Sequence, residues 1–322
     1  MMRSALQIVV LFAVVFAGVS VNAQTITKTF GSGTNQFSLD FVEIGNPGNA
    51  ADPTSIPTST GAVNYIYNLG KYEISRDQIN KANSAGNLGI TLQDMTSYGG
   101  NGANRPATGI SWNEAARFVN YLNTSQGYQV AYKFTTNTAN ANIMLWGAGE
   151  YTSENNQYRH KNAYYFLPSR DEWFKGGYFD PNKPGGAGYW DFATGGDTAA
   201  TSVSGGTSGA VYSQPISQGP ADITSAGGLS PYGTMGQGGN VMEWIEDAGT
   251  GVNDSPTAPR EYRGGAWMNG FASMKSTDRG GMSPGTEVYQ LGFRVASVPE
   301  PSSLSLLAVG LGVVLRQRRR TV

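Results

Sequence analysis

The chain has 322 residues, with 22 Lys and Arg against 23 Asp and Glu, a single histidine and no cysteine. This composition excludes a disulfide framework and thiol chemistry, and the lack of a basic excess argues against nucleic-acid binding. Charged residues form only 14% of the chain, glycine contributes 44 residues and aromatic residues reach 11%, which predicts a folded domain rich in loops rather than a disordered chain.

The first 23 residues are typical of a secretory signal peptide. Arg3 precedes an apolar run over 5–17, and the small-residue site Val-Asn-Ala follows at 21–23. An uncleaved membrane anchor is the alternative, but the apolar run is short for a spanning helix. We therefore predict that residues 1–23 are removed by cleavage before Gln24.

Two strands are expected early in the domain. Apolar side chains alternate over 36–44, and this period of two is typical of a half-buried strand. A second aromatic and apolar run over 63–67 predicts another strand, with a break at 68–70.

Three helix starts share the same local chemistry. A serine is followed three residues later by Glu or Gln, so that each residue's side chain binds the other's backbone amide. The pairs are Ser75 with Gln78, Ser111 with Glu114, and Ser169 with Glu172. Ile74 and Ile79 flank the first start as a hydrophobic staple. The second start opens the clearest apolar helix face, which comprises Ala115, Phe118, Val119 and Leu122.

The stretch 181–231 is dominated by small and polar residues, and it predicts a long surface excursion. Regular order is expected to return in three compact blocks marked by glycine and aromatic residues. These blocks are Gly-Asn-Val-x-Glu-Trp from Gly239, Arg-Gly-Gly-x-Trp from Arg263, and Gly-Phe-Arg from Gly292.

The C-terminal segment 299–322 has an ordered composition. It begins Pro-Glu-Pro, continues with an apolar run over 304–315 and ends with four arginines between 316 and 320. Twelve helical residues extend only ~18 Å, against a hydrocarbon core of about 30 Å, so the run alone spans a membrane poorly. The arginines would hold its end on the cytoplasmic side. A frayed terminus, the alternative, explains neither the arginines nor the Pro-Glu-Pro.

This order of parts resembles the PEP-CTERM sorting signal. In its family the signal is recognised and removed by an exosortase after export through the general secretory route. The resemblance implies an exosortase as a partner, transient membrane contact through the tail, and a secreted or cell-surface protein.

Residues 24–298 remain between the two ends and suffice for one domain. Without Arg3 and the four tail arginines the basic residues number 17, and without Glu300 the acidic residues number 22. This span therefore carries a net charge of −5. Stability must come from packing, hydrogen bonds or bound ions, because no disulfide is available.

Several short motifs follow one another in this domain. They are Gly70-Lys71-Tyr72-Glu73-Ile74-Ser75 with Gln78, Pro106 with Gly109, Ser111-Trp112 with Ala115-Ala116, Leu167-Pro168-Ser169 with Glu172-Trp173, and the three blocks above. In this order they resemble the formylglycine-generating enzyme (sulfatase-modifying factor) domain, from about Phe37 to Val298. The resemblance implies an irregular α+β fold related to C-type lectins, with short strands, a few helices and much loop.

Enzymes of that family oxidise a cysteine of a client sulfatase to formylglycine, with two cysteines that hold copper. The resemblance places those cysteines near Asn269 and Met274, neither of which is a thiol. Because monovalent copper requires thiolate ligands, we expect no catalytic cofactor and no formylglycine-generating activity. A second branch uses iron held by several histidines, whereas His160 stands alone and is expected to be an exposed loop residue.

The superfamily also contains non-catalytic binding modules. The resemblance places the substrate groove near Trp267, Asn269, Phe271 and Arg279, which we take as the candidate ligand pocket. The structural alternative is a core position for Trp267 and an internal ion pair for Arg279.

The resemblance further implies structural calcium. Glu243 would supply a carboxylate, and Gly239 and Val241 carbonyl oxygens, which are ligands suited to this ion. The remaining side-chain ligand falls at Gly236, which has no side chain, and Gln237 is the nearest substitute. The alternative is that Glu243 binds backbone amides in a turn.

Export, the sorting tail and the missing cysteines favour a non-catalytic binding protein of the cell surface or matrix, with a glycan or peptide ligand. An oxidoreductase of the formylglycine-generating type, or an enzyme with changed chemistry, is one alternative. Asp278, Arg279 and Glu287 are its available titratable groups. A structural component of an exopolysaccharide layer is the other alternative.

Overall fold

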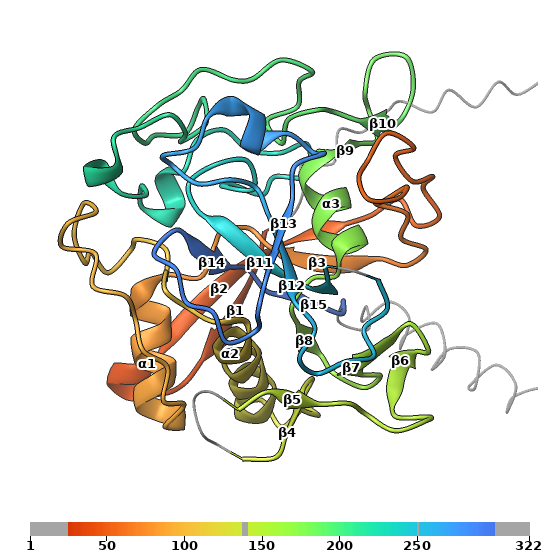
Figure 1. Ribbon diagram of the computed structural model, residues 1–322, viewed down its shortest axis with the longest axis vertical. Helices are drawn as coiled ribbons and strands as arrows, with labels where there is room; N and C mark the ends of the chain where they lie inside the picture. The colour runs from red at the N-terminus through yellow and green to blue at the C-terminus, as the bar shows by residue number, and fades with distance from the viewer. Residues whose placement is uncertain (1–24, 137–140, 250, 300–322) are drawn as a thin grey trace, which may run out of the picture.

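The computed structural model describes residues 25–136, 141–249 and 251–299. Within these residues the strands are short and the helices few, so the expected irregular α+β architecture is confirmed (Figure 1). The described strands form no closed barrel. None of the described helices is both long and apolar enough to cross a membrane. The predicted signal peptide and most of the sorting tail lie outside the described residues.

The larger sheet has the strand order β1-β2-β3-β15-β8, and all of its pairings are antiparallel. Its strands are β1 (Thr25–Phe30), β2 (Phe37–Ile44), β3 (Tyr67–Gly70), β15 (Ala296–Ser297) and β8 (Tyr165–Phe166). The last strand of the domain therefore lies inside the sheet that the first strand begins.

The smaller sheet has the order β13-β12-β11-β14 and collects the three glycine-marked blocks of the sequence. Its strands are β11 (Met242–Ala248), β12 (Arg260–Arg263), β13 (Gly280–Met282) and β14 (Leu291–Phe293). Only the β11 and β14 pair is parallel. Three two-stranded ribbons complete the described strands. They are β4 (Lys133–Phe134) with β5 (Ile143–Met144), β6 (Tyr151–Ser153) with β7 (Asn156–His160), and β9 (Phe179–Asp180) with β10 (Gly188–Tyr189).

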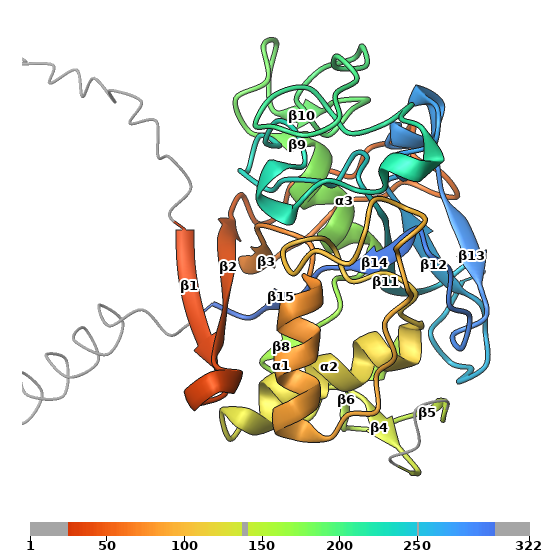
Figure 2. The same cartoon turned by 90° about the vertical axis from the view of Figure 1, so that its left-hand side faces the viewer.

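The three predicted helix starts are confirmed, and each carries a complete capping box. The helices are α1 (Arg76–Gly86), α2 (Trp112–Ser125) and α3 (Arg170–Tyr178), with Ser75, Ser111 and Ser169 as their N-caps. Short 3-10 turns occupy Gly33–Asn35, Ile216–Gln218, Ile223–Ser225 and Phe271–Met274. Figure 2 shows β1 and β2 on one side of the molecule and β12 and β13 on the other, with α1 and α2 between them. The predicted apolar face of α2 is buried in the main core.

The second predicted strand is wrong in position. The residues expected to break it at 68–70 form β3, whereas Tyr65 and Ile66 are exposed and lie outside any strand. Gly70 marks a close approach rather than a break, because a Cβ there would lie 3.0 Å from the Val295 carbonyl oxygen. Sequence periodicity cannot report such a contact with a distant segment.

The stretch 181–231 is irregular, as predicted, but it is not only a surface excursion. Phe192, Val211 and Ile223 are buried, and Figure 1 shows the green and teal loops packed over one end of the domain. The small residues permit this packing. A Cβ at Gly239, for example, would lie 2.6 Å from the Val211 carbonyl oxygen.

Candidate functional site

The loop between β12 and β13 contains all four predicted ligand residues, and two of them, Trp267 and Asn269, connect it to the segment around Ser213 and Ile216. Trp267 is fully buried, and its indole nitrogen donates to the Ile216 carbonyl at 3.2 Å. The Asn269 side-chain oxygen accepts from the Ala266 amide at 2.8 Å, while the Asn269 carbonyl accepts from the Ser213 amide. Both residues therefore fix the path of the loop.

Met274, at the second cysteine position, fills space that two glycines leave open. It is buried, and a Cβ at Gly265 would meet its terminal methyl group at 2.1 Å. A Cβ at Gly239 would lie 3.3 Å from its sulfur atom. The cavity beside Met274 has a volume of about 10 Å³, which is roughly the space of one water molecule. A substrate side chain does not fit there.

Phe271 and Arg279 complete the predicted pocket residues but lie in different surroundings. Phe271 begins the 3-10 turn and is 55% exposed. The Arg279 guanidinium donates to the Gly249 carbonyl at 3.0 Å and lies 3.6 Å from the Glu261 carboxylate. Among the described residues no hydrogen bond, ion pair or ring contact joins Arg279 to Trp267. The ligand role of the four residues stays a prediction.

Glu243, the predicted calcium carboxylate, is fully buried and engaged. Its two oxygens accept from Arg294 at 2.5 and 2.6 Å, and one also accepts from the Trp173 indole at 2.7 Å. A guanidinium ion thus neutralises this carboxylate, and Gly236 offers no side-chain ligand. The donor set with Gly239 and Val241 does not fit a calcium ion in this arrangement, since Arg294 would have to move.

A second buried carboxyl lies close to Gly236. A Cβ at Gly236 would lie 3.1 Å from the Glu73 carboxyl group, which accepts from the Asn240 side chain and the Val241 amide. Burial, followed by the nearby charge of Glu243, raises the pKa of Glu73 well above its usual value. Burial and the nearby Glu243 charge thus favour the uncharged form of the Glu73 carboxyl group.

His160 differs from its predicted exposed loop position. It lies in β7, half-buried, with its ring edge-on to Trp146 at 4.6 Å between centroids. Its Nδ1 accepts from the Asn162 amide, and burial lowers its pKa. The packed imidazole stabilises the turn after β7 through this hydrogen bond.

The titratable groups near the loop after β12 are few. Burial raises the pKa of Asp278 and of Glu287, although both residues are exposed at the surface. No group of three or more His, Cys, Asp or Glu residues in the described part of the chain could hold a metal ion.

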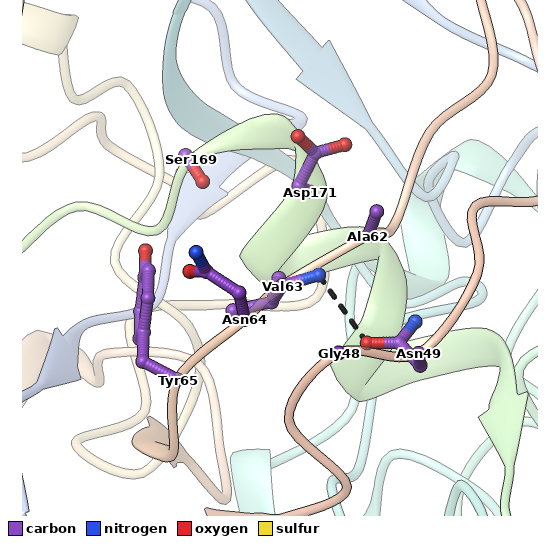
Figure 3. A pocket seen from close by; sticks show the side chains of 8 residues that line it. All are labelled: Gly48, Asn49, Ala62, Val63, Asn64, Tyr65, Ser169 and Asp171. Atoms are coloured by element: carbon purple, nitrogen blue, oxygen red, sulfur yellow. Dashed lines mark hydrogen bonds between the residues drawn. The ribbon is translucent and has the colours of Figure 1, made fainter.

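A wider opening than the one beside Met274 lies between the segment that precedes β3 and the start of α3 (Figure 3). Its volume is about 410 Å³, which is within the range typical of small-molecule sites. The lining consists of Gly48, Asn49, Ala62, Val63, Asn64, Tyr65, Ser169 and Asp171. We call this opening the Tyr65 cavity.

A buried ion network supports the wall of the Tyr65 cavity. The Tyr65 hydroxyl donates to Glu172 at 2.7 Å, and Glu172 pairs with Arg159 through two contacts of 3.1 Å. Arg159 also contacts Glu246 at 2.6 Å. Burial, followed by the Glu172 charge, raises the pKa of Tyr65, so its phenol stays protonated. Charged and hydrogen-bonded partners thus fix the orientation of the ring.

Sequence reasoning missed this cavity. The capping box identified Ser169 and the apolar run identified 63–67, but no motif connects the two segments. The Gly61 amide donates to the Asp171 carboxylate at 2.7 Å, and this contact joins the segment before β3 to α3 beside the cavity.

Residues 41–298 match the family described as "Sulfatase-modifying factor enzyme 1-like domain", and residues 297–320 match the PEP-CTERM protein-sorting motif. No curated protein matches the chain.

Among the solved structures that match the chain, three illustrate the shared fold. "Treponema denticola variable protein 1" has a TM-score of 0.59 at 18% identity, covering 85% of this chain and 99% of its own. "Crystal Structure of CarF" has a TM-score of 0.53 at 19% identity, covering 81% of this chain and 99% of its own. "Structure of PvdO from Pseudomonas aeruginosa" has a TM-score of 0.50 at 13% identity, covering 84% of this chain and 98% of its own. At these identities the similarity concerns the fold alone.

Proposed function

Because this chain belongs to the family with a sulfatase-modifying factor enzyme 1-like domain and ends in a PEP-CTERM motif, we propose that it is an exported, non-catalytic binding protein. Its place is the cell surface or the extracellular matrix, since the sorting motif implies export and is processed by an exosortase. Its ligand is a glycan or a peptide.

The observation that carries this proposal is the structural use of both cysteine positions. Asn269 closes the loop after β12, and Met274 packs against Gly239 and Gly265. An amide and a buried thioether supply no thiolate for monovalent copper. The oxidoreductase alternative would therefore require a thiol-free mechanism with ligands that neither residue provides.

The first test is to incubate the full chain with a cysteine-bearing sulfatase peptide, copper and oxygen, and to follow the peptide mass. We expect an unchanged mass, because no thiolate is present to hold the metal. Conversion of the peptide cysteine to formylglycine would overturn the non-catalytic proposal.

The second test is binding to a glycan panel and to a peptide panel. Saturable binding to a member of either panel supports the proposal, and a chain that binds neither contradicts it. Co-extraction with the polysaccharide layer without saturable binding would favour a structural component instead.

If the ligand lies at the predicted pocket, Phe271→Ala weakens binding, whereas Leu229→Ala, also at an exposed apolar residue, leaves it unchanged.

A further inference from the structure

We propose that the Tyr65 cavity is a binding site for a neutral saccharide. This inference rests on the proposed binding function and names both a site and a ligand class for it. It is independent of the loop after β12, because the cavity lies between the segment before β3 and the first turn of α3.

The cavity presents polar groups that the protein leaves partly unused. Asn64 is exposed, and its amide makes no hydrogen bond to any described residue. One oxygen of Asp171 accepts from the Gly61 amide, and the other has no hydrogen-bond partner among the described residues. The Ser169 oxygen accepts from the Glu172 amide, which leaves its hydroxyl proton free to donate.

This mixture of donors and acceptors suits hydroxyl groups. A sugar hydroxyl both donates and accepts, as serine and threonine hydroxyls do. The Asn64 amide can engage two neighbouring hydroxyls, because it offers both an acceptor and a donor. The free Asp171 oxygen accepts one such hydrogen bond with charge assistance, which makes the bond stronger than a neutral one.

The charge of the lining excludes anionic ligands. The lining contains one carboxylate, that of Asp171, and no Lys, Arg or His. Lys175 lies behind the cavity wall, where its ammonium group donates to the Asn46 carbonyl at 2.9 Å and lies 3.5 Å from that of Val63. It is fully buried and is not part of the lining. Phosphorylated or sulfated ligands would therefore lack a cation to pair with.

Tyr65 supplies the apolar contact that a sugar ring requires. Tyr65 is 47% exposed and lines the cavity, while its hydroxyl is fixed by Glu172. The ring also packs edge-on against Tyr67, with centroids 6.1 Å apart. A ring that is apolar on its face and anchored at its polar tip can cover the C–H face of a saccharide.

The segment before β3, which forms one wall of the cavity, is held in place by hydrogen bonds within the protein. The Asn49 side chain donates to the Gly61 carbonyl at 2.8 Å and to the Tyr189 hydroxyl at 2.7 Å, and it accepts from the Val63 amide at 3.2 Å. Figure 3 shows this last contact at the cavity rim. A preformed wall reduces the entropy cost of binding.

The test titrates the full chain with glucose, galactose, mannose, N-acetylglucosamine and their β1,4-linked dimers, detected by saturation-transfer NMR and calorimetry. Wild type is expected to bind at least one of these probes. Asn64→Ala and Asp171→Asn should each weaken that binding by about tenfold, as the loss of one hydrogen bond to a polar or charged group predicts. Asp171→Asn keeps an oxygen for the Gly61 amide, so the fold should persist.

The control is Asn104→Ala, which removes an exposed amide outside the cavity and should leave affinity unchanged. Thermal unfolding of each variant shows whether it is folded. If Asp171→Asn does not fold, the affinity of Asn64→Ala alone tests the site. Binding unaffected by Asn64→Ala would overturn the site. Binding of peptides but of no sugar would overturn the saccharide while leaving the proposed function intact, and binding of neither would overturn both.

Discussion

Several buried charged residues in the described part of the chain have a partner of opposite charge. Arg294 with Glu243, and Arg159 with Glu172, are examples in which the carboxylate is fully buried and hydrogen-bonded. Such pairing is necessary because an isolated buried charge costs several kcal/mol. Asp247 is half-buried and lacks such a partner in that part of the chain. Its carboxylate accepts from the Arg170 amide at 2.6 Å and forms no ion pair of 4 Å or less among the described residues.

Asp247 should make the stability of the fold depend on pH. Burial is the main cause that raises its pKa to about 7. As the pH rises from about 4 to 7, the unfolded chain loses this proton before the folded chain does, so the free energy of unfolding falls with rising pH. Asp247→Asn should flatten this slope and stabilise the protein at about pH 8 by on the order of 1–3 kcal/mol.

Urea unfolding at several pH values between about 4 and 8 measures this slope. Asp254→Asn is the matched control, because Asp254 is exposed and should leave the slope as in wild type. An Asp247→Asn variant whose slope equals that of wild type would show that this carboxyl titrates normally.

At the scale of the element, local chemistry decides where helices begin, and distant contacts decide where strands lie. Ser75, Ser111 and Ser169 each accept from the backbone amide three residues on, within a complete capping box. These contacts span one turn and can be read from sequence. In contrast, β3 is defined by its pairing with β2 and β15, which no local pattern specifies.

The capping box of α2 should contribute measurably to stability. Ser111 is buried, and its hydroxyl also contacts the Glu114 carboxylate at 2.9 Å. Ser111→Ala should lower the free energy of unfolding by about 1–2 kcal/mol, since an orphan amide loses its acceptor. Ser97→Ala, at an exposed serine outside any helix, should change stability little. Equal stability of the two variants, measured by urea unfolding, would show that the box is redundant.

At the scale of the whole molecule, the two ends of the domain meet in one sheet. β1 begins the larger sheet and β15 lies inside it between β3 and β8. Figure 2 shows the two described ends of the chain on the same side of the molecule, next to this sheet. The sorting motif, at 297–320, therefore begins within the strand that completes the fold.

Truncation should locate the border between the domain and its tail. The Val298 amide donates to the Tyr164 carbonyl at 3.0 Å, and the Val298 carbonyl accepts from the Asn68 side chain. A chain that ends at Pro299 should keep its melting temperature. A chain that ends at Val295 loses β15 and should unfold at a much lower temperature, because β3 and β8 lose their common partner. Equal melting temperatures would mean that β15 is dispensable.

The sequence by itself determined the features that depend on neighbouring residues or on composition. These include the three helix starts, the alternating strand β2, the family of the domain and the order of parts in the tail. They are readable because capping boxes, strand alternation and motif blocks act over a few residues.

Only the tertiary structure decided the features that depend on contacts between distant segments. Glu243 in β11 pairs with Arg294, which directly follows β14. Met274 fills the space beside Gly265, and Asp171 connects α3 to Gly61. The last of these contacts joins the two segments that line the Tyr65 cavity. Such contacts follow from how the chain packs, since a buried polar group must find its partner wherever in the sequence that partner lies.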